Sequence, residues 1–231
     1  MSTQVKNKEV IDFYIEKKFE LEQFLVAVRT FFQKHPKLNK QPFPIIHSIK
    51  TRFKDPSHLD DKIQRKLEKG ISITKENLFE EINDLIGIRV LHLHQDQFVR
   101  INAEITDKID SGDWKFVESP KAYTWDPESI KMFENLKITH ELRETYYTSV
   151  HYVITPNNDN PVSCEIQVRT LFEEIWGEID HIINYPHPTD SIASKEQLRV
   201  LAKLVSTGTR LADSIFRSHN DYLNRNVDGK T

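Results

Sequence analysis

Polar side chains of three chemical types alternate with apolar ones where the stretch Cys164–Tyr185 begins. In an extended strand Glu165, Gln167 and Arg169 share one face, because successive side chains point to opposite faces. An acid, an amide and a base on one face suit metal- and phosphate-dependent chemistry. The spacing then becomes helical, with a polar stripe formed by Glu174, Glu178, His181 and Tyr185. Core packing alone does not explain this arrangement, so it predicts a functional site.

A second group of candidate residues is basic and lies earlier in the chain. Lys50, Arg52 and Lys54 are spaced by two, so a strand over about 45–54 would present all three on one face. Lys62 follows in a short predicted helix. Three like charges on one strand face repel one another, and a polyphosphate ligand would bring them together. The alternative is an ordinary solvated charged face.

Two charges interrupt the apolar stretch 84–91. Asp84 opens it and Arg89 lies inside it. A buried unpaired charge costs several kcal/mol, so these charges predict a ligand, a metal ion or a mutual ion pair. Their opposite parity in an extended strand makes direct pairing awkward. His92 and His94 alternate further along, a spacing that can bind metal, but no cysteine or further histidine lies nearby to complete such a site.

A third strand is predicted over 146–154 from its β-branched and aromatic residues. Its odd positions place Tyr147, Ser149 and His151 on one face. The turn-forming segment 156–161 then returns the chain antiparallel into the strand that carries Glu165. The Tyr/Ser/His face should therefore lie beside the Glu/Gln/Arg face and form one shared site with it.

Composition limits what the chain can be. With 231 residues, 38% of them hydrophobic, it can bury one substantial core. A net charge of -3 argues against a generally cationic nucleic-acid binder. The single cysteine, Cys164, fits a reducing cytosol, and neither a signal peptide nor a membrane-spanning run is present, so a cytoplasmic protein is expected. The Gly-rich phosphate-binding motifs are missing, so side chains must hold any phosphate.

The chain divides into three segments by its proline-rich breaks. Residues 1–44 are predicted to be an N-terminal helix (over about 8–34) and a linker. Residues 45–185 form the core, an α+β domain with a mixed β-sheet flanked by helices. Residues 186–231 begin with prolines and contain a helix over about 194–219, which covers the core or mediates a homo-oligomer. The tail from residue 220 is expected to be disordered.

The ordered motifs within 45–185 resemble the synthetase domain of the RelA/SpoT family. They are Arg52-x-Lys54 followed by Lys62, Asp84-x-x-Gly87-x-Arg89, Tyr147-x-Ser149-x-His151, and Glu165-Ile-Gln167-x-Arg169-Thr170 with Trp176 and His181. That family transfers the β,γ-pyrophosphate of ATP to the 3′-hydroxyl of GDP or GTP, which makes (p)ppGpp. The resemblance implies a nucleotidyltransferase-like fold. The chain lacks a His-Asp dipeptide and has no room for a hydrolase domain, so it resembles a small, synthetase-only member.

For the ATP side, the resemblance implies roles position by position. Asp84 and Glu165 match the acidic pair: Asp84 would hold Mg²⁺, and Glu165 would bind the metal and help to deprotonate the acceptor hydroxyl. Arg52 and Arg89 match the arginines that sandwich the adenine. The cations on the ATP phosphates correspond to Lys54 and Lys62, with Lys50 in support.

For the acceptor side, Tyr147 matches the aromatic residue that stacks on guanine. His151, Gln167 and Arg169 complete that wall, and His181 supports it or contacts phosphate. The sequence departs from the family pattern at several places. His58 occupies the position of the usual serine, the Gly-Tyr-Arg/Lys-Ser motif becomes Tyr146-Tyr147-Thr148-Ser149, and the segment 118–145 is longer than usual. Arg143 is the candidate that replaces the lost cation.

These departures leave the acceptor open. One alternative is a toxin that pyrophosphorylates the 3′ end of tRNA, blocks translation and pairs with an antitoxin protein. A catalytically inactive nucleotide-sensing module is the other alternative. Retention of both Asp84 and Glu165 argues against the inactive module, because a binding protein has no need of two metal-binding acids.

Overall fold

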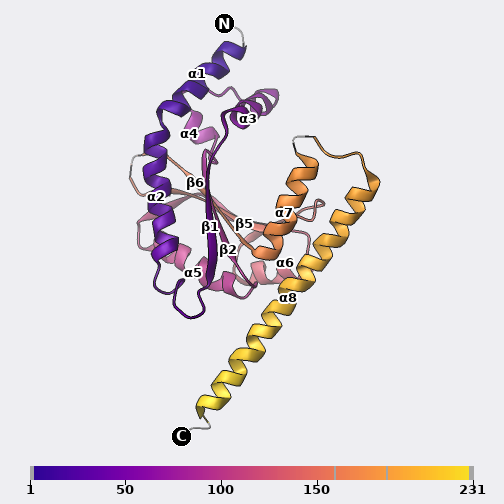
Figure 1. Cartoon of the computed structure of the whole chain (residues 1–231). Coiled ribbons are helices and arrows are strands. Elements are labelled where there is room, and N and C mark those ends of the chain that lie inside the picture. Colours follow the sequence, from indigo (N-terminus) through magenta and orange to yellow (C-terminus); the bar gives the residue numbers. More distant parts are fainter. Residues whose placement is uncertain (1–2, 159, 186, 229–231) are drawn as a thin grey trace.

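The computed structural model of the protein describes residues 3–158, 160–185 and 187–228 (Figure 1). In this part of the chain the helices are α1 (Thr3–Glu16), α2 (Lys18–Lys34), α3 (Pro56–Glu68), α4 (Leu78–Glu81), α5 (Gln97–Asp110), α6 (Pro127–Asn135), α7 (Leu171–Asn184) and α8 (Ile192–Asp228). The strands are β1 (Ile46–Phe53), β2 (Ile86–His92), β3 (Trp114–Thr124), β4 (Thr139–Leu142), β5 (Ser149–Pro156) and β6 (Cys164–Thr170).

One mixed sheet joins the strands in the order β1-β2-β6-β5-β3-β4. β2 runs parallel to β6 and β3 parallel to β4, whereas the other neighbours are antiparallel. The predicted return of the chain after the turn is confirmed, because β5 and β6 pair antiparallel with His151 opposite Gln167. The α+β prediction with a mixed sheet flanked by helices is therefore confirmed.

The two faces of the sheet differ in chemistry because the strand residues alternate. The apolar face packs against α2 and α5, whose Val28, Phe32 and Ile101 share one core with Ile88 and Val168. The opposite face carries a polar row across four adjacent strands. Its members lie at matching positions in the register, namely Lys50, Arg89, Gln167 and His151.

The N-terminal segment differs from the prediction of one helix. It forms two helices that meet at Lys17, where the backbone is still close to helical geometry. Both contribute to the core of the sheet domain, through Val10 and Tyr14 of α1 and Leu21 and Phe24 of α2. The described part of this segment, residues 3–44, is thus an integral layer of the domain.

A capping box starts α7 directly after β6. The Thr170 hydroxyl accepts a hydrogen bond from the Glu173 backbone N–H at 3.2 Å, and the Glu173 carboxylate accepts one from the Thr170 N–H at 2.7 Å. The strand therefore passes into the helix without a loop. This fixes the helix relative to the polar face and places Glu174 above it. The predicted helix end at Pro186 lies outside the described residues, and α7 ends at Asn184.

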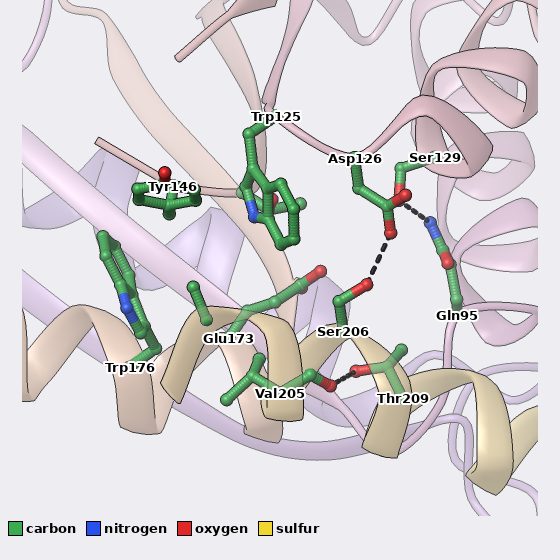
Figure 2. Close-up of a pocket in the computed structure, with 12 residues that line it drawn as sticks. Gln95, Trp125, Asp126, Ser129, Tyr146, Glu173, Trp176, Val205, Ser206 and Thr209 are labelled. Atoms are coloured by element: carbon green, nitrogen blue, oxygen red, sulfur yellow. Dashed lines mark hydrogen bonds between the residues drawn. The ribbon is translucent and has the colours of Figure 1, made fainter. Parts of the chain in front are cut away.

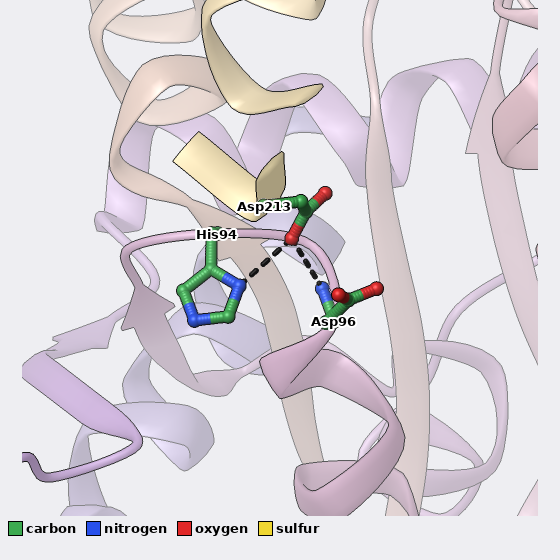
Figure 3. Close-up of side chains that lie close together, drawn as sticks. All are labelled: His94, Asp96 and Asp213. Carbon is green, nitrogen blue, oxygen red and sulfur yellow. Dashed lines mark hydrogen bonds and ion pairs between the residues drawn. The ribbon is translucent and has the colours of Figure 1, made fainter. Parts of the chain in front are cut away.

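The long helix α8 is tied to the domain by a cluster of His94, Asp96 and Asp213 (Figure 3). Asp213 Oδ1 accepts from His94 Nδ1 at 2.7 Å and from the Asp96 backbone N–H at 2.8 Å. Arg217 of α8 holds the Asp96 carboxylate with two hydrogen bonds of 2.6 and 2.8 Å. Because these acids already have cationic or N–H partners, the cluster serves to anchor α8.

The expectation of a disordered tail from residue 220 is wrong for residues 220–228, which continue α8. This segment contains neither glycine nor proline, so nothing in it interrupts the helix. The next glycine along the chain is Gly229, which lies outside the described residues.

A small cavity of about 370 Å³, including space open to solvent, lies between α8 and the domain (Figure 2). Trp125, Tyr146 and Trp176 form its aromatic wall, and the Glu173 side chain lies in it. Burial raises the pKa of Glu173 to about 7, against the opposing effect of its hydrogen bonds with Thr170. Ionised Glu173 is therefore unfavourable in the folded protein.

Glu173→Gln should make the protein more stable than the wild type at pH 8, because glutamine keeps the capping box and carries no charge. In the unfolded chain the pKa is about 4.3, so the wild type loses stability as the pH rises from about 4 to 7. Urea unfolding at pH 4.5 and pH 8 measures this. Glu196→Gln, at an exposed acid of α8, is the control. An equal effect of Glu173→Gln at both pH values would contradict the prediction.

Candidate active site

Glu165 lies on the polar face of β6 among three donors. Its carboxylate contacts Gln167 Nε2 at 2.8 Å, His151 Nδ1 at 3.2 Å and Arg52 Nη2 at 3.3 Å. Burial alone would raise the pKa of Glu165, but His151 and Arg52 outweigh burial and lower the pKa to about 2. The carboxylate is therefore ionised at neutral pH.

Asp84 lies just before β2 and contacts two lysines. Lys54 Nζ is 2.8 Å from Oδ2, and Lys62 Nζ is 2.8 Å from Oδ1. Burial again opposes ionisation, but the two lysines lower the pKa of Asp84 to about 2. Lys54 is buried, and this burial lowers its own pKa despite the Asp84 charge.

Each basic residue predicted to project from β1 has an acidic partner. Lys50 Nζ lies 2.7 Å from Glu174, Arg52 pairs with Glu165, and Lys54 follows the strand and pairs with Asp84. Repulsion among these like charges therefore needs no bound polyphosphate to relieve it. The acids come from distant parts of the chain, so strand spacing alone could not reveal the pairing.

Gly87 gives Arg52 the space to reach Glu165. It lies opposite Arg52 on β1 and Glu165 on β6. A Cβ atom at Gly87 would lie 3.2 Å from Arg52 Nε, so a side chain there would crowd the arginine. This gives a physical reason for glycine in the Asp-x-x-Gly-x-Arg motif.

Tyr147 and His151 lie on the other side of Glu165, where the sequence predicts the acceptor site. The Tyr147 hydroxyl lies 3.0 Å from His151 Nε2, and His151 Nδ1 faces Glu165. Since the ionised Glu165 only accepts, Nδ1 carries a proton, and in the neutral imidazole Nε2 accepts from Tyr147. The Arg169 guanidinium lies 5.7 Å from the centre of the Tyr147 ring. Burial raises the pKa of Tyr147.

A cleft of about 1300 Å³, including space open to solvent, brings most of the predicted residues together. Those that line it are Arg52, His58, Arg89, Tyr147, Gln167, Arg169 and His181. Beside it, a pocket of about 470 Å³ is lined by Lys50, Arg52, Arg89, Glu165 and Gln167. A third pocket, of about 740 Å³, contains Lys54, Lys62 and Asp84. Arg52 lines the first two, so the predicted ATP side and acceptor side adjoin.

Three supporting residues lie at the margins. The His58 ring meets the Tyr185 ring edge-on at 5.0 Å, and His181 stacks on the same tyrosine at 4.6 Å. This contact brings α3 and the end of α7 together at the cleft. Arg143 does not line the cleft: it pairs with Glu141 and lies over the Tyr123 ring. Tyr123 in turn packs edge-on against His151.

Some residues at these pockets had no role in the sequence prediction. Arg65, Lys66 and Lys69 line the pocket of Asp84. Their helical spacing after Lys62 is the signal that could have found them. Glu174 was placed on a polar stripe without a function, and Gly177 carried no signal.

The altered Tyr146-Tyr147 motif has a backbone consequence. Tyr146 has a φ of 64°, a left-handed conformation that favours glycine, which the family pattern has at this position. Its ring packs edge-on against Trp125 at 5.2 Å. Next to His58, the Ser57 hydroxyl and backbone N–H donate to Asp55 at the start of α3.

The donor set of Asp84 and Glu165 fits Mg²⁺. Both are ionised carboxylates with hard oxygen atoms, and the charge of Asp84 acts on Glu165. Mg²⁺ binds typically through one or two carboxylates together with substrate phosphates. The surrounding cations Lys54, Lys62 and Arg52 balance the two charges in the protein alone.

No helix in the described ranges 3–158, 160–185 and 187–228 is sufficiently long and apolar to cross a membrane.

The fold is similar to solved structures of known proteins. The crystal structure of the small alarmone synthetase 1 from Bacillus subtilis has a TM-score of 0.66 and 17% identity, with 91% of this chain and 97% of that chain covered. A GTP pyrophosphokinase family protein from Streptococcus pneumoniae has a TM-score of 0.65 and 21% identity, with 96% and 97% covered. The Bacillus subtilis protein bound to its product pppGpp has a TM-score of 0.60 and 21% identity, with 89% and 93% covered.

At identities of 17% and 21%, the structural similarity shows that the fold is shared. No curated protein sequence matches the chain significantly. The family described as the region found in RelA/SpoT proteins matches residues 51–190, which is more than half of the chain. The protein therefore belongs to the RelA/SpoT family of nucleotide pyrophosphokinases.

Proposed function

We propose that the protein transfers the β,γ-pyrophosphate of ATP to the 3′-hydroxyl of GDP or GTP, which makes (p)ppGpp. The observation that carries the proposal is the pair of ionised carboxylates, Asp84 and Glu165, at pockets rich in lysine and arginine. Phosphoryl-group chemistry depends mainly on positioning and on electrostatic stabilisation, which this arrangement supplies.

On the donor side, Arg52 and Arg89 hold the adenine of ATP, and Lys54 and Lys62 bind its phosphates. Asp84 and Glu165 hold Mg²⁺, which neutralises phosphate charge when bound. Glu165, which is ionised in the folded protein, would take the proton of the acceptor 3′-hydroxyl as that oxygen attacks the β-phosphorus of ATP; the bond from this phosphorus to the α-phosphate breaks, and AMP leaves.

On the acceptor side, Tyr147 stacks on the guanine, and His151, Gln167 and Arg169 complete the wall. His151 links Tyr147 to Glu165 by contacts of 3.0 and 3.2 Å, so the base-binding residue and the proton acceptor are positioned together. The similar Bacillus subtilis structure was determined with its product pppGpp, which supports a guanosine acceptor for a site of this fold.

Incubation with Mg²⁺ and ATP labelled at the γ-phosphate tests the proposal, with GDP, GTP and deacylated tRNA offered separately. Label in a guanosine nucleotide is the expected result. Label in tRNA instead would assign the protein to the toxin class and would predict an antitoxin protein as its partner. Transfer to none of the three, with ATP bound, would contradict the proposed function.

Tyr147→Ala should raise the KM for GDP or GTP about 5- to 150-fold, because base–aromatic stacking contributes about 1–3 kcal/mol. The KM for ATP should change much less. Tyr147→Phe is the control, since it keeps the ring and removes only the hydroxyl contact with His151. An equal rise in the KM for ATP and in the KM for the acceptor in Tyr147→Ala would show that this residue does not belong to the acceptor site.

A further inference from the structure

The polar contacts of the candidate site close into a ring. Arg89 Nε donates to Gln167 at 3.2 Å, Gln167 donates to Glu165, Glu165 contacts His151, and His151 contacts Tyr147. Arg169 lies over Tyr147 and pairs with Glu174 at 2.5 Å. Glu174 pairs with Arg89 at 3.3 Å and so completes the ring.

Glu174 is the point at which the two sides of the site meet. It binds a cation from each of three adjacent strands: Lys50 of β1, Arg89 of β2 and Arg169 of β6. Its side chain is only 6% exposed. The positive charges of these neighbours lower its pKa against the opposing effect of burial. Removal of the Glu174 carboxylate would leave Lys50, Arg89 and Arg169 without the acid that they share.

Arg169 is buried and depends on a gap in α7. Arg169 is 3% exposed, and its Nε atom has no hydrogen-bond partner among the described residues. Gly177 provides the gap, since a Cβ atom there would lie 2.6 Å from Arg169 Nη1. Glycine is unfavourable inside a helix compared with alanine, so α7 loses local stability to accommodate the guanidinium.

We propose that Glu174 and Gly177 are positioning residues, which seat the Arg169 guanidinium against Tyr147 and thereby set the affinity for the acceptor base. The charge of Glu174 holds the guanidinium from one side, and the absent side chain of Gly177 gives it room. Arg169 then fixes the Tyr147 ring through a cation–π contact. This inference rests on the proposed function, because it names what controls the acceptor side of that reaction.

Gly177→Ala is the sharper test, because alanine favours the helix and its methyl group would displace only the flexible end of Arg169. The melting temperature should change little, because the gain from alanine in the helix opposes the disturbance of the Arg169–Glu174 ion pair. The KM for GDP or GTP should rise about tenfold, and the KM for ATP should change less than about twofold. A lower melting temperature together with an equal rise in the KM for ATP and in the KM for the acceptor would overturn the positioning role.

Glu174→Gln and Glu178→Gln form a matched pair one helical turn apart. Both acids contact Lys50 and Arg89, but only Glu174 contacts Arg169. Effects on the KM for ATP should therefore be similar, whereas the KM for the acceptor should rise only in Glu174→Gln. An equal acceptor effect in both variants would overturn the inference.

Activity of the wild type separates failure of the positioning role from failure of the proposed function. If it transfers label to GDP or GTP and Gly177→Ala leaves the acceptor KM unchanged, the positioning role fails and the proposed function stands. If the wild type transfers label to no acceptor, the proposed function fails and this inference is overturned with it.

Discussion

Glu165→Gln is expected to slow pyrophosphate transfer by about 10²–10⁴-fold, the usual contribution of a positioned general base. Glutamine keeps the size of the side chain and can still accept a hydrogen bond from Arg52 or His151. It removes the negative charge that would bind the metal and take the proton of the acceptor hydroxyl. Transfer of γ-label under saturating ATP and acceptor measures the effect, with circular dichroism to verify the fold.

The control is Glu118→Gln, which changes an exposed glutamate on β3 and should leave transfer unchanged. Near-normal transfer by Glu165→Gln would refute the assignment of Glu165 as catalytic residue and metal ligand.

The same substitution has a consequence for the pH dependence of stability. The pKa of Glu165 is about 2 in the folded protein and about 4.3 in an unfolded chain. The ionised carboxylate therefore adds stability above about pH 4.3, and this contribution is lost as the pH falls toward 2. The difference in the free energy of unfolding between the wild type and Glu165→Gln, on the order of 1–3 kcal/mol at pH 7, should shrink over that range.

Asp84→Asn is expected to abolish transfer at ordinary Mg²⁺ concentrations and to raise the Mg²⁺ concentration needed for half-maximal activity. The reason is that asparagine offers one neutral oxygen in place of an ionised carboxylate. Lys54, which is buried, would lose its charged partner, so we also expect a loss of stability of about 1–3 kcal/mol. Transfer assays over a range of Mg²⁺ concentrations and thermal unfolding measure both effects.

Asp61→Asn is the matched control for Asp84→Asn, because it changes an exposed acid on α3, the helix that carries Lys62. It should alter neither the Mg²⁺ dependence nor the stability. If Asp84→Asn showed the same Mg²⁺ dependence as the wild type, Asp84 could not be a metal ligand.

The sequence by itself determined most of the strands of the site and the faces they present. The strand predicted over 146–154 begins only at Ser149, so Tyr147 lies just before β5. Period-2 alternation placed Glu165, Gln167 and Arg169 on one face, and the short turn before β6 required β5 to be its antiparallel neighbour. These are local constraints, since they depend on residues a few positions apart. Helix ends were harder to predict: α8 continues past residue 220, where residues 220–228 contain neither glycine nor proline.

Only the tertiary structure decided which charges meet. Glu174 reaches Lys50 across 124 positions of the chain, and Asp84 reaches Lys54 across 30. Such contacts depend on the packing of α7 over the sheet and on the pairing of β1 with β2, which no local pattern encodes. The space at Gly177 is likewise defined by the distant end of the Arg169 side chain. Strand periodicity thus determines which residues form the polar face, whereas tertiary packing determines which partner each charged residue on that face contacts.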